Sequence, residues 1–200
     1  MADMPVRDRI CYAAFGAFLE HGYEGTSTLM IATRAKVSKR ELYAHFRNKR
    51  EMFAAGVASR TRRMSQPLDL PQAQNRTALA ATLFGFGRTF LREVTQPEVT
   101  AVIRLVLADA SRSGELAETF YKIGREPPRL ALIRLFARAG EAGLIGGADP
   151  ERVAGQYFSL LMGDLQMQLM LRVAVPPNEA EIDRRARAAT DAVMTLYPVA

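Results

Sequence analysis

The residues best suited to chemistry lie between Thr26 and Lys49, and they carry hydroxyl, aromatic and basic groups. Thr26 and Ser27 precede a short apolar segment typical of a helix. A helix N-terminus with a hydroxyl group and free backbone N–H groups favours a phosphate. Lys39 and Arg40 come at the start of a second such segment, and an arginine can donate two hydrogen bonds to guanine O6 and N7. Lys49 lies just after it. This pattern favours contact with a polyanion over catalysis.

The elements that must position these groups are short helices. Ser38 is followed three residues later by a glutamate, a capping-box pattern that begins a helix. Tyr43 and His45 bring donors that can reach phosphate, while Leu42 and Phe46, four residues apart, form the face that packs inward. Two short helices joined by a tight turn, preceded by a longer one, predict a helix-turn-helix DNA reader.

The charge distribution points the same way. Residues 1–66 hold 12 Lys and Arg against 6 Asp and Glu, whereas residues 67–200 hold 15 of each, so the whole net charge of +6 lies in the first third. A one-sided excess of this kind favours a polyanionic partner for that third alone. Double-stranded DNA is the expected partner.

Other functional classes find little support in the residue types. The chain has two histidines and one cysteine, Cys11, and lacks an HExxH, P-loop or paired-cysteine pattern. We therefore expect no enzyme activity, no cofactor and no metal. The start of the chain does not read as a signal peptide and no apolar run reaches about 18 residues, so we expect a cytoplasmic protein without a membrane partner. A helical carrier of apolar molecules that does not read DNA is the alternative function.

Helix signals dominate the rest of the chain, and hairpin signals are missing. We expect an all-α fold of about nine helices: a helix-turn-helix domain over residues 1–53, and a helical ligand-binding and dimerisation domain over residues 54–200. Residues 65–74 form the expected linker. The expected helices are 6–21, ending at Gly22, two short ones after residues 28 and 38, then 49–64, 75–96, 97–113, 115–143 interrupted by Pro127-Pro128, 149–173 and 178–197.

The N-terminal segment resembles a known family. The stretch 22–28 (GYEGTST), Ile31-Ala32 and the stretch 37–49 (VSKRELYAHFRNK) are similar to the DNA-binding signature of TetR/AcrR regulators over about residues 6–53. The resemblance implies a homeodomain-like three-helix domain. It implies that these residues lie at the DNA: Thr26, Ser27, Ser38, Lys39, Arg40, Tyr43, His45 and Lys49.

Five residues, at three places in the segment, depart from that signature. Lys36 stands in the turn, where the family often has glycine, and Arg40-Glu41 stand where Gly-Thr is common. Leu29 and Met30 occupy positions that are often polar. These departures leave the base preference open.

The second half resembles the C-terminal domain of AefR-like regulators at residues 156–165 (QYFSLLMGDL). TetR-like regulators carry an effector cavity in this domain, which implies a small apolar or aromatic effector. Phenylalanine and methionine suit such a cavity, although core packing is the better explanation for any single one of them. The candidate lining residues are Phe86, Phe90, Arg104, Leu107, Phe120, Tyr121, Phe158, Met162 and Met167.

A stripe of small residues on one predicted helix indicates close helix packing. Gly155, Ser159 and Gly163 recur every four residues. We expect them to form an intersubunit four-helix bundle, the alternative being a close contact within one chain. The expected partner residues on the last helix are Ile182, Ala186, Ala189 and Val193. The resulting hypothesis is a homodimeric repressor that binds a pseudo-palindromic operator and is released by its effector, with coupling through residues 49–64.

Overall fold

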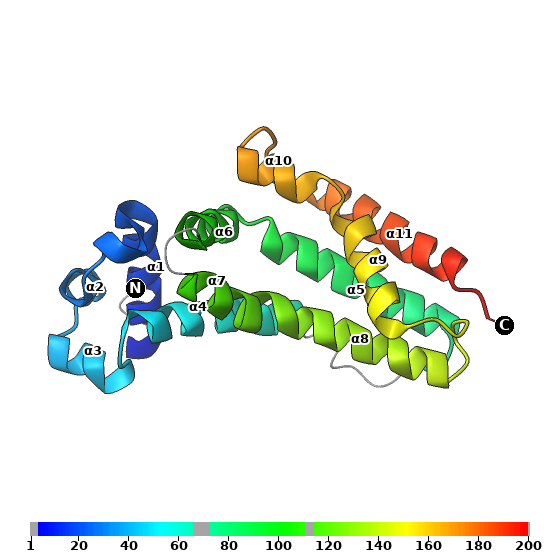
Figure 1. The fold of residues 1–200 in the computed structure, drawn as a ribbon, viewed down its shortest axis with the longest axis horizontal. Helices are drawn as coiled ribbons and strands as arrows, with labels where there is room; N and C mark the ends of the chain where they lie inside the picture. The colour runs from blue at the N-terminus through cyan, green and yellow to red at the C-terminus, as the bar shows by residue number, and fades with distance from the viewer. Residues whose placement is uncertain (1–3, 66–72, 111–113, 200) are drawn as a thin grey trace. The chain divides into compact units, whose positions relative to one another are not determined.

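The computed structural model describes residues 4–65, 73–110 and 114–199, and all regular structure in these ranges is helical, which confirms the all-α prediction (Figure 1). Most of the predicted linker, residues 66–72, lies outside the described residues. None of the helices in the described part of the chain is long and apolar enough to cross a membrane. The elements are α1 (Val6–Gly25), α2 (Thr28–Ala35), α3 (Lys39–His45), α4 (Lys49–Ser65), α5 (Arg76–Val94), α6 (Pro97–Ala110), α7 (Glu115–Phe120), a π-helical turn (Tyr121–Arg125), α8 (Glu126–Glu141), α9 (Pro150–Met162), α10 (Leu165–Leu171) and α11 (Glu179–Leu196).

The helices form two compact units that do not follow chain order. The first unit comprises Met1–Arg60 and Ala101–Gly124, and the second comprises Thr61–Thr100 and Arg125–Ala200. The chain therefore passes from one unit to the other within α4, within α6 and within the π-helical turn. The expected domain boundary between residues 53 and 54 stays a prediction.

Two of the predicted helices, 149–173 and 115–143, are interrupted in the structure, one at a glycine and one just before two prolines. Gly163 adopts φ 48°, a conformation that favours glycine, and splits the expected helix 149–173 into α9 and α10. The second predicted helix, 115–143, is interrupted just before Pro127-Pro128. A proline ring clashes with the carbonyl group four residues earlier, so the regular α-helix is disturbed on the N-terminal side of the prolines. A wider π-helical turn fills that stretch, and the two prolines lie in the first turn of α8.

The core of the first unit is built on α1. Its face of Ile10, Ala14 and Phe18 packs with apolar side chains of α2, α3 and α4, and the rings of Phe15 and Phe53 stack with centroids 5.7 Å apart. A Cβ atom at Gly56 would lie 1.9 Å from the Phe15 ring, so α4 needs glycine there to approach α1. The core also includes Val102, Val106 and Leu116, which come from α6 and α7.

The second unit packs α5, α8, α9 and α11 around an aromatic cluster. The rings of Phe90 and Phe158 meet edge to face at 5.0 Å. The Tyr157 hydroxyl donates to the Leu83 carbonyl at 2.6 Å, and burial raises the pKa of Tyr157. A Cβ atom at Gly87 would lie 2.4 Å from that hydroxyl, so α5 and α9 approach closely at this point.

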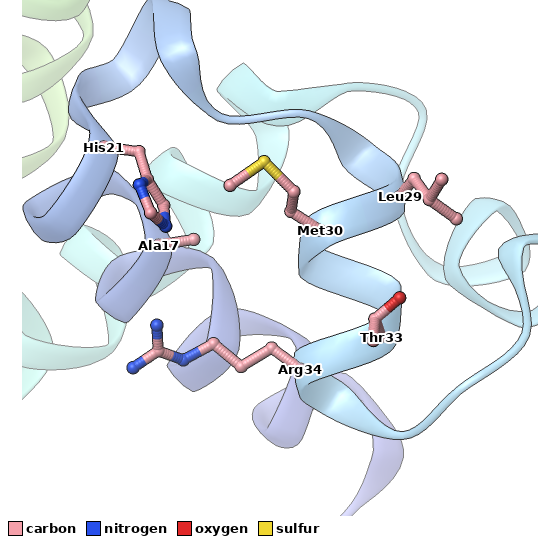
Figure 2. A pocket seen from close by; sticks show the side chains of 6 residues that line it. All are labelled: Ala17, His21, Leu29, Met30, Thr33 and Arg34. Carbon is pink, nitrogen blue, oxygen red and sulfur yellow. The ribbon is translucent and has the colours of Figure 1, made fainter.

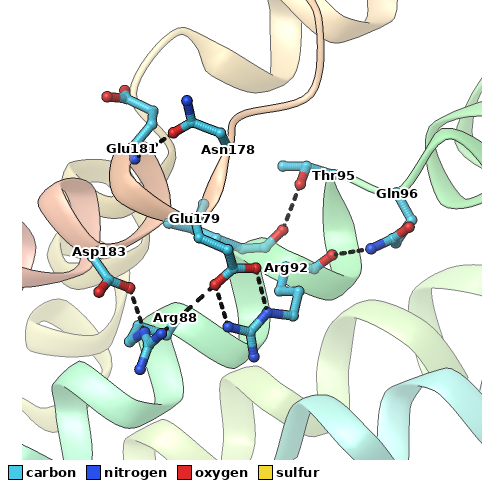
Figure 3. Close-up of polar contacts among 9 residues, drawn as sticks. Arg88, Arg92, Thr95, Gln96, Asn178, Glu179, Glu181 and Asp183 are labelled. Carbon is cyan, nitrogen blue, oxygen red and sulfur yellow. Dashed lines mark hydrogen bonds and ion pairs between the residues drawn. The ribbon is translucent and has the colours of Figure 1, made fainter.

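Polar contacts fasten α5 to α11 at both ends. Near the start of α11, Arg92 binds Glu179 with two hydrogen bonds, one of them at 2.9 Å, and Arg88 pairs with Glu179 and Asp183 (Figure 3). Near its end, the half-buried Arg76 donates to the backbone carbonyls of Leu144 at 2.7 Å and Tyr197 at 2.9 Å, and also to that of Met194.

Candidate nucleic-acid interface

The helix α2, which precedes the turn, is capped at both ends. The Ser27 hydroxyl accepts a hydrogen bond from the Met30 N–H at 3.1 Å, which begins α2. At the other end Lys36 adopts the left-handed conformation, with φ 54°, and its N–H bonds to the Ala32 and Thr33 carbonyls. The turn is therefore formed without a glycine, at a conformational cost of about 1–2 kcal/mol.

The next helix, α3, begins as the sequence predicts. The Ser38 hydroxyl accepts a hydrogen bond from the Glu41 N–H at 3.0 Å. Leu42 is fully buried, and Phe46, the C-cap residue, is 1% exposed. These two side chains pack α3 against the core, Glu41 is half-buried, and the remaining side chains of the helix are exposed.

The exposed face of α3 carries the predicted DNA-contacting groups. Lys39, Arg40 and His45 are exposed, and Tyr43 is 47% exposed. The Tyr43 hydroxyl lies 3.1 Å from the Thr28 hydroxyl, which joins the N-terminus of α2 to the middle of α3. The structure thus brings donors from both helices onto one surface of the first unit.

Thr26 does not take part in that surface, and its predicted contact with phosphate is wrong. Its side chain is 1% exposed, and its hydroxyl oxygen lies 2.7 Å from the Gly22 carbonyl oxygen and 3.0 Å from that of Ala17. The single hydroxyl proton is therefore donated to the α1 backbone, at the point where Gly22, with φ 73°, interrupts the helix. Thr28, which the sequence reasoning did not select as a site residue, places its hydroxyl 3.1 Å from that of Tyr43 on this surface. Its place at the first residue of α2 was the available signal.

Lys49 has a partner within the protein. Its ammonium group donates to the Tyr23 carbonyl at 2.8 Å and lies 4.8 Å from the centre of the Tyr23 ring. Burial raises the pKa of Tyr23 to about 12, so this ring stays neutral at ordinary pH. Lys49 ties the start of α4 to the end of α1, and its contact with phosphate stays a prediction.

The predicted effector residues are divided between the two units. Phe86, Phe90 and Phe158 are buried in the aromatic cluster, with Met162 packed against the same core. Met167 belongs to the second unit but is 57% exposed. The other four belong to the first unit, where Leu107 and Tyr121 are largely exposed: Arg104, Leu107, Phe120 and Tyr121.

The residues predicted to form the dimer interface fall into an exposed group and a buried group. Gly155, Ser159 and Gly163 are exposed on α9 and at its end. The four residues chosen on α11 lie inside the protomer, where they pack in the core of the second unit, and their assignment to an interface is wrong: Ile182, Ala186, Ala189 and Val193. The periodicity located the apolar face of α11 correctly, but that face contacts α5 and α9.

The described residues hold no group of three or more His, Cys, Asp or Glu side chains that could bind a metal ion. A surface hollow of about 520 Å³ lies between α1 and α2, lined by Ala17, His21, Leu29, Met30, Thr33 and Arg34 (Figure 2). Arg34 is tied down at its edge by an ion pair with Glu20 at 2.7 Å.

Comparison with known proteins gives a consistent result. The model of bacterial regulatory proteins of the tetR family matches residues 10–55, and that of the AefR-like transcriptional repressor C-terminal domain matches residues 81–199. No curated protein sequence matches the chain.

Solved structures cover nearly the whole chain. A protein from Mesorhizobium loti MAFF303099, assigned to the TetR family of transcriptional regulators, is 28% identical with a TM-score of 0.77 and coverage of 97% of each chain. The flavonoid-responsive regulator FrrA is 28% identical with a TM-score of 0.75 and coverage of 96% of each. A TetR regulator from Agrobacterium tumefaciens, 24% identical with a TM-score of 0.78, covers 97% of this chain and 95% of its own, and shares the fold. The chain belongs to the TetR family of transcriptional regulators, and its C-terminal domain is of the AefR-like type.

Proposed function

We propose that this regulator is a repressor that binds a pseudo-palindromic operator as a homodimer and releases it when a flat, apolar effector binds the second unit. The exposed face of α3 is the observation that carries the proposal. Lys39, Arg40 and Tyr43 project from a helix anchored by Leu42 and begun by the Ser38 cap. A rigid helix with basic residues in its first turn is suited to the major groove.

The aromatic cluster supports the class of effector. Phe86, Phe90 and Phe158 offer ring faces and edges in the core of the second unit, and the Arg125 guanidinium lies 4.8 Å from the centre of the Phe158 ring. FrrA, which shares 28% identity, is a flavonoid-responsive regulator. Flat aromatic compounds are therefore the effectors to test first. Because the chain crosses between the units within α4, α6 and the π-helical turn, a shift of these helices would carry the signal.

The first prediction concerns the wild-type protein. Duplexes selected by the protein from a random pool should share an inverted repeat with half-sites about one helical turn, roughly 34 Å, apart. Naringenin should release the selected duplex in fluorescence anisotropy, because an effector that prefers the released state lowers operator affinity. Sucrose is the control compound. Selection that yields no common sequence would favour the carrier without DNA readout, and a selected operator that no aromatic compound releases would overturn the effector class.

The second prediction concerns the dimer. Gly155→Arg should separate the protomers, because Gly155 lies on the exposed stripe of α9 and a Cβ atom there has open space within the protomer. Gly140→Arg is the matched control, since Gly140 lies on α8 and its Cβ position is equally open. Light scattering after size-exclusion chromatography should give a monomer only for Gly155→Arg, with weaker operator binding. A dimer that persists in Gly155→Arg would contradict an interface at α9.

A further inference from the structure

Leu29 is an apolar side chain at a polar surface. It is the second residue of α2 and is 61% exposed, although leucine gains free energy from burial. Its neighbours Ser27 and Thr28 carry hydroxyls, and Thr28 contacts the Tyr43 hydroxyl at 3.1 Å. Core packing therefore does not explain this leucine, and its position adjoins the candidate DNA-binding surface.

Leu29 is one of the residues that line the hollow between α1 and α2, but its side chain points in another direction than those of Met30 and Arg34. Figure 2 shows Met30 and Arg34 pointing from α2 toward Ala17 and His21 of α1. Leu29 and Thr33, four residues apart, point to the other side of the same helix. Leu29 thus lies at the edge of the hollow, and in the chain it directly follows Thr28, whose hydroxyl contacts that of Tyr43 on α3.

The chemistry of DNA limits what a leucine can recognise there. It can neither donate nor accept a hydrogen bond, so it cannot read the polar edge of any base. The C5-methyl group of thymine is the apolar feature that a base presents in the major groove. We propose that Leu29 contacts a thymine methyl group in each half-site and so distinguishes thymine from cytosine. This inference rests on the proposed operator binding, and it adds a specificity-determining residue on α2 to those on α3.

The test removes the methyl group from the DNA and the leucine from the protein. Deoxyuridine replaces thymidine at each position of the selected operator in turn, which deletes the methyl and keeps the base pair. For the wild-type protein, replacement at one particular position of a half-site should lower the affinity for the operator about fourfold, which corresponds to the burial of one carbon atom. Replacement at that position in both half-sites should lower it about 15-fold. For Leu29→Ala the same replacement should change the affinity less than about twofold.

Leu19→Ala is the matched control, because Leu19 is a partly exposed leucine of the same unit, on α1. It should show the full wild-type loss with deoxyuridine. Both variants alter exposed side chains, so their thermal midpoints should match that of the wild type.

The outcomes are distinct. A selective complex that tolerates deoxyuridine at every position, or a Leu29→Ala variant that keeps the full loss, overturns the inference and leaves the proposed function standing. The second outcome would assign recognition of the methyl group to another residue. If Leu29→Ala weakens binding to all duplexes by the same factor, Leu29 contacts the sugar–phosphate backbone, and the inference is also overturned. Failure to select any operator overturns both proposals.

Discussion

Replacing both Lys39 and Arg40 with alanine is expected to lower affinity for the operator by at least about 100-fold, while binding to random DNA falls far less. Both side chains are exposed in the first turn of α3, the part of a recognition helix that reaches base edges. A good bidentate contact contributes about 1–3 kcal/mol of discrimination, and a dimer would make each contact twice. Fluorescence anisotropy with operator and scrambled duplexes measures both affinities.

The control must remove the same charge elsewhere. Lys122→Ala with Arg134→Ala does so at exposed positions outside the helix-turn-helix, and its operator affinity should stay within about threefold of wild type. The single variant Arg40→Ala should relax the preference at one position of each half-site. Equal losses on operator and scrambled DNA in the double variant would assign both residues to phosphate contacts instead of base readout.

Arg76→Met is expected to lower the free energy of unfolding by about 3–5 kcal/mol, the largest effect on stability that we anticipate. The Arg76 guanidinium binds the carbonyls of Leu144, Met194 and Tyr197, which come from the segment after α8 and from the end of α11. Methionine keeps the apolar stem and removes every donor, so three carbonyls lose a charged partner. Urea unfolding followed by far-ultraviolet circular dichroism gives the difference.

Arg92→Met on the same helix provides the comparison. Its guanidinium also makes two hydrogen bonds to α11, but to the exposed carboxylate of Glu179, and solvent-exposed ion pairs contribute about 0–1 kcal/mol. The Arg92 variant should therefore unfold close to wild type. Similar losses in the two variants would show that Arg76 stabilises the unit no more than a surface ion pair does.

Helix starts were predictable because the signals that set them act over three residues. Ser27, Ser38, Asn75 and Asn178 each accept a hydrogen bond from the backbone N–H three residues later, as their sequence positions indicate. The break at Gly163 was not predicted. The surrounding pattern fits one continuous helix, and a glycine within a helix is tolerated at modest cost, so local preference did not reveal it.

The exposed residues of α3 in the candidate interface could be predicted from the sequence, but the exposure of each threonine near the start of α2 could not. Lys39, Arg40 and Tyr43 follow from the spacing of Ser38, Leu42 and Phe46, which fixes the inward face of α3. Thr26 and Thr28 are both plausible from sequence, since each is a hydroxyl near a helix start. Only the folded backbone around the kink at Gly22, where the Thr26 hydroxyl lies within hydrogen-bonding distance of α1 carbonyls, decides that Thr26 turns inward.

The sequence by itself determined the helical class, the helix starts, the basic first third and the side chains on the outer face of α3, because each depends on local spacing or composition. Tertiary structure alone decided what each apolar face contacts. It placed Ile182, Ala186, Ala189 and Val193 inside the protomer and joined Val102, Val106 and Leu116 to the core of the first unit. A hydrophobic pattern states that a face will be covered, but its partner depends on contacts between distant parts of the chain.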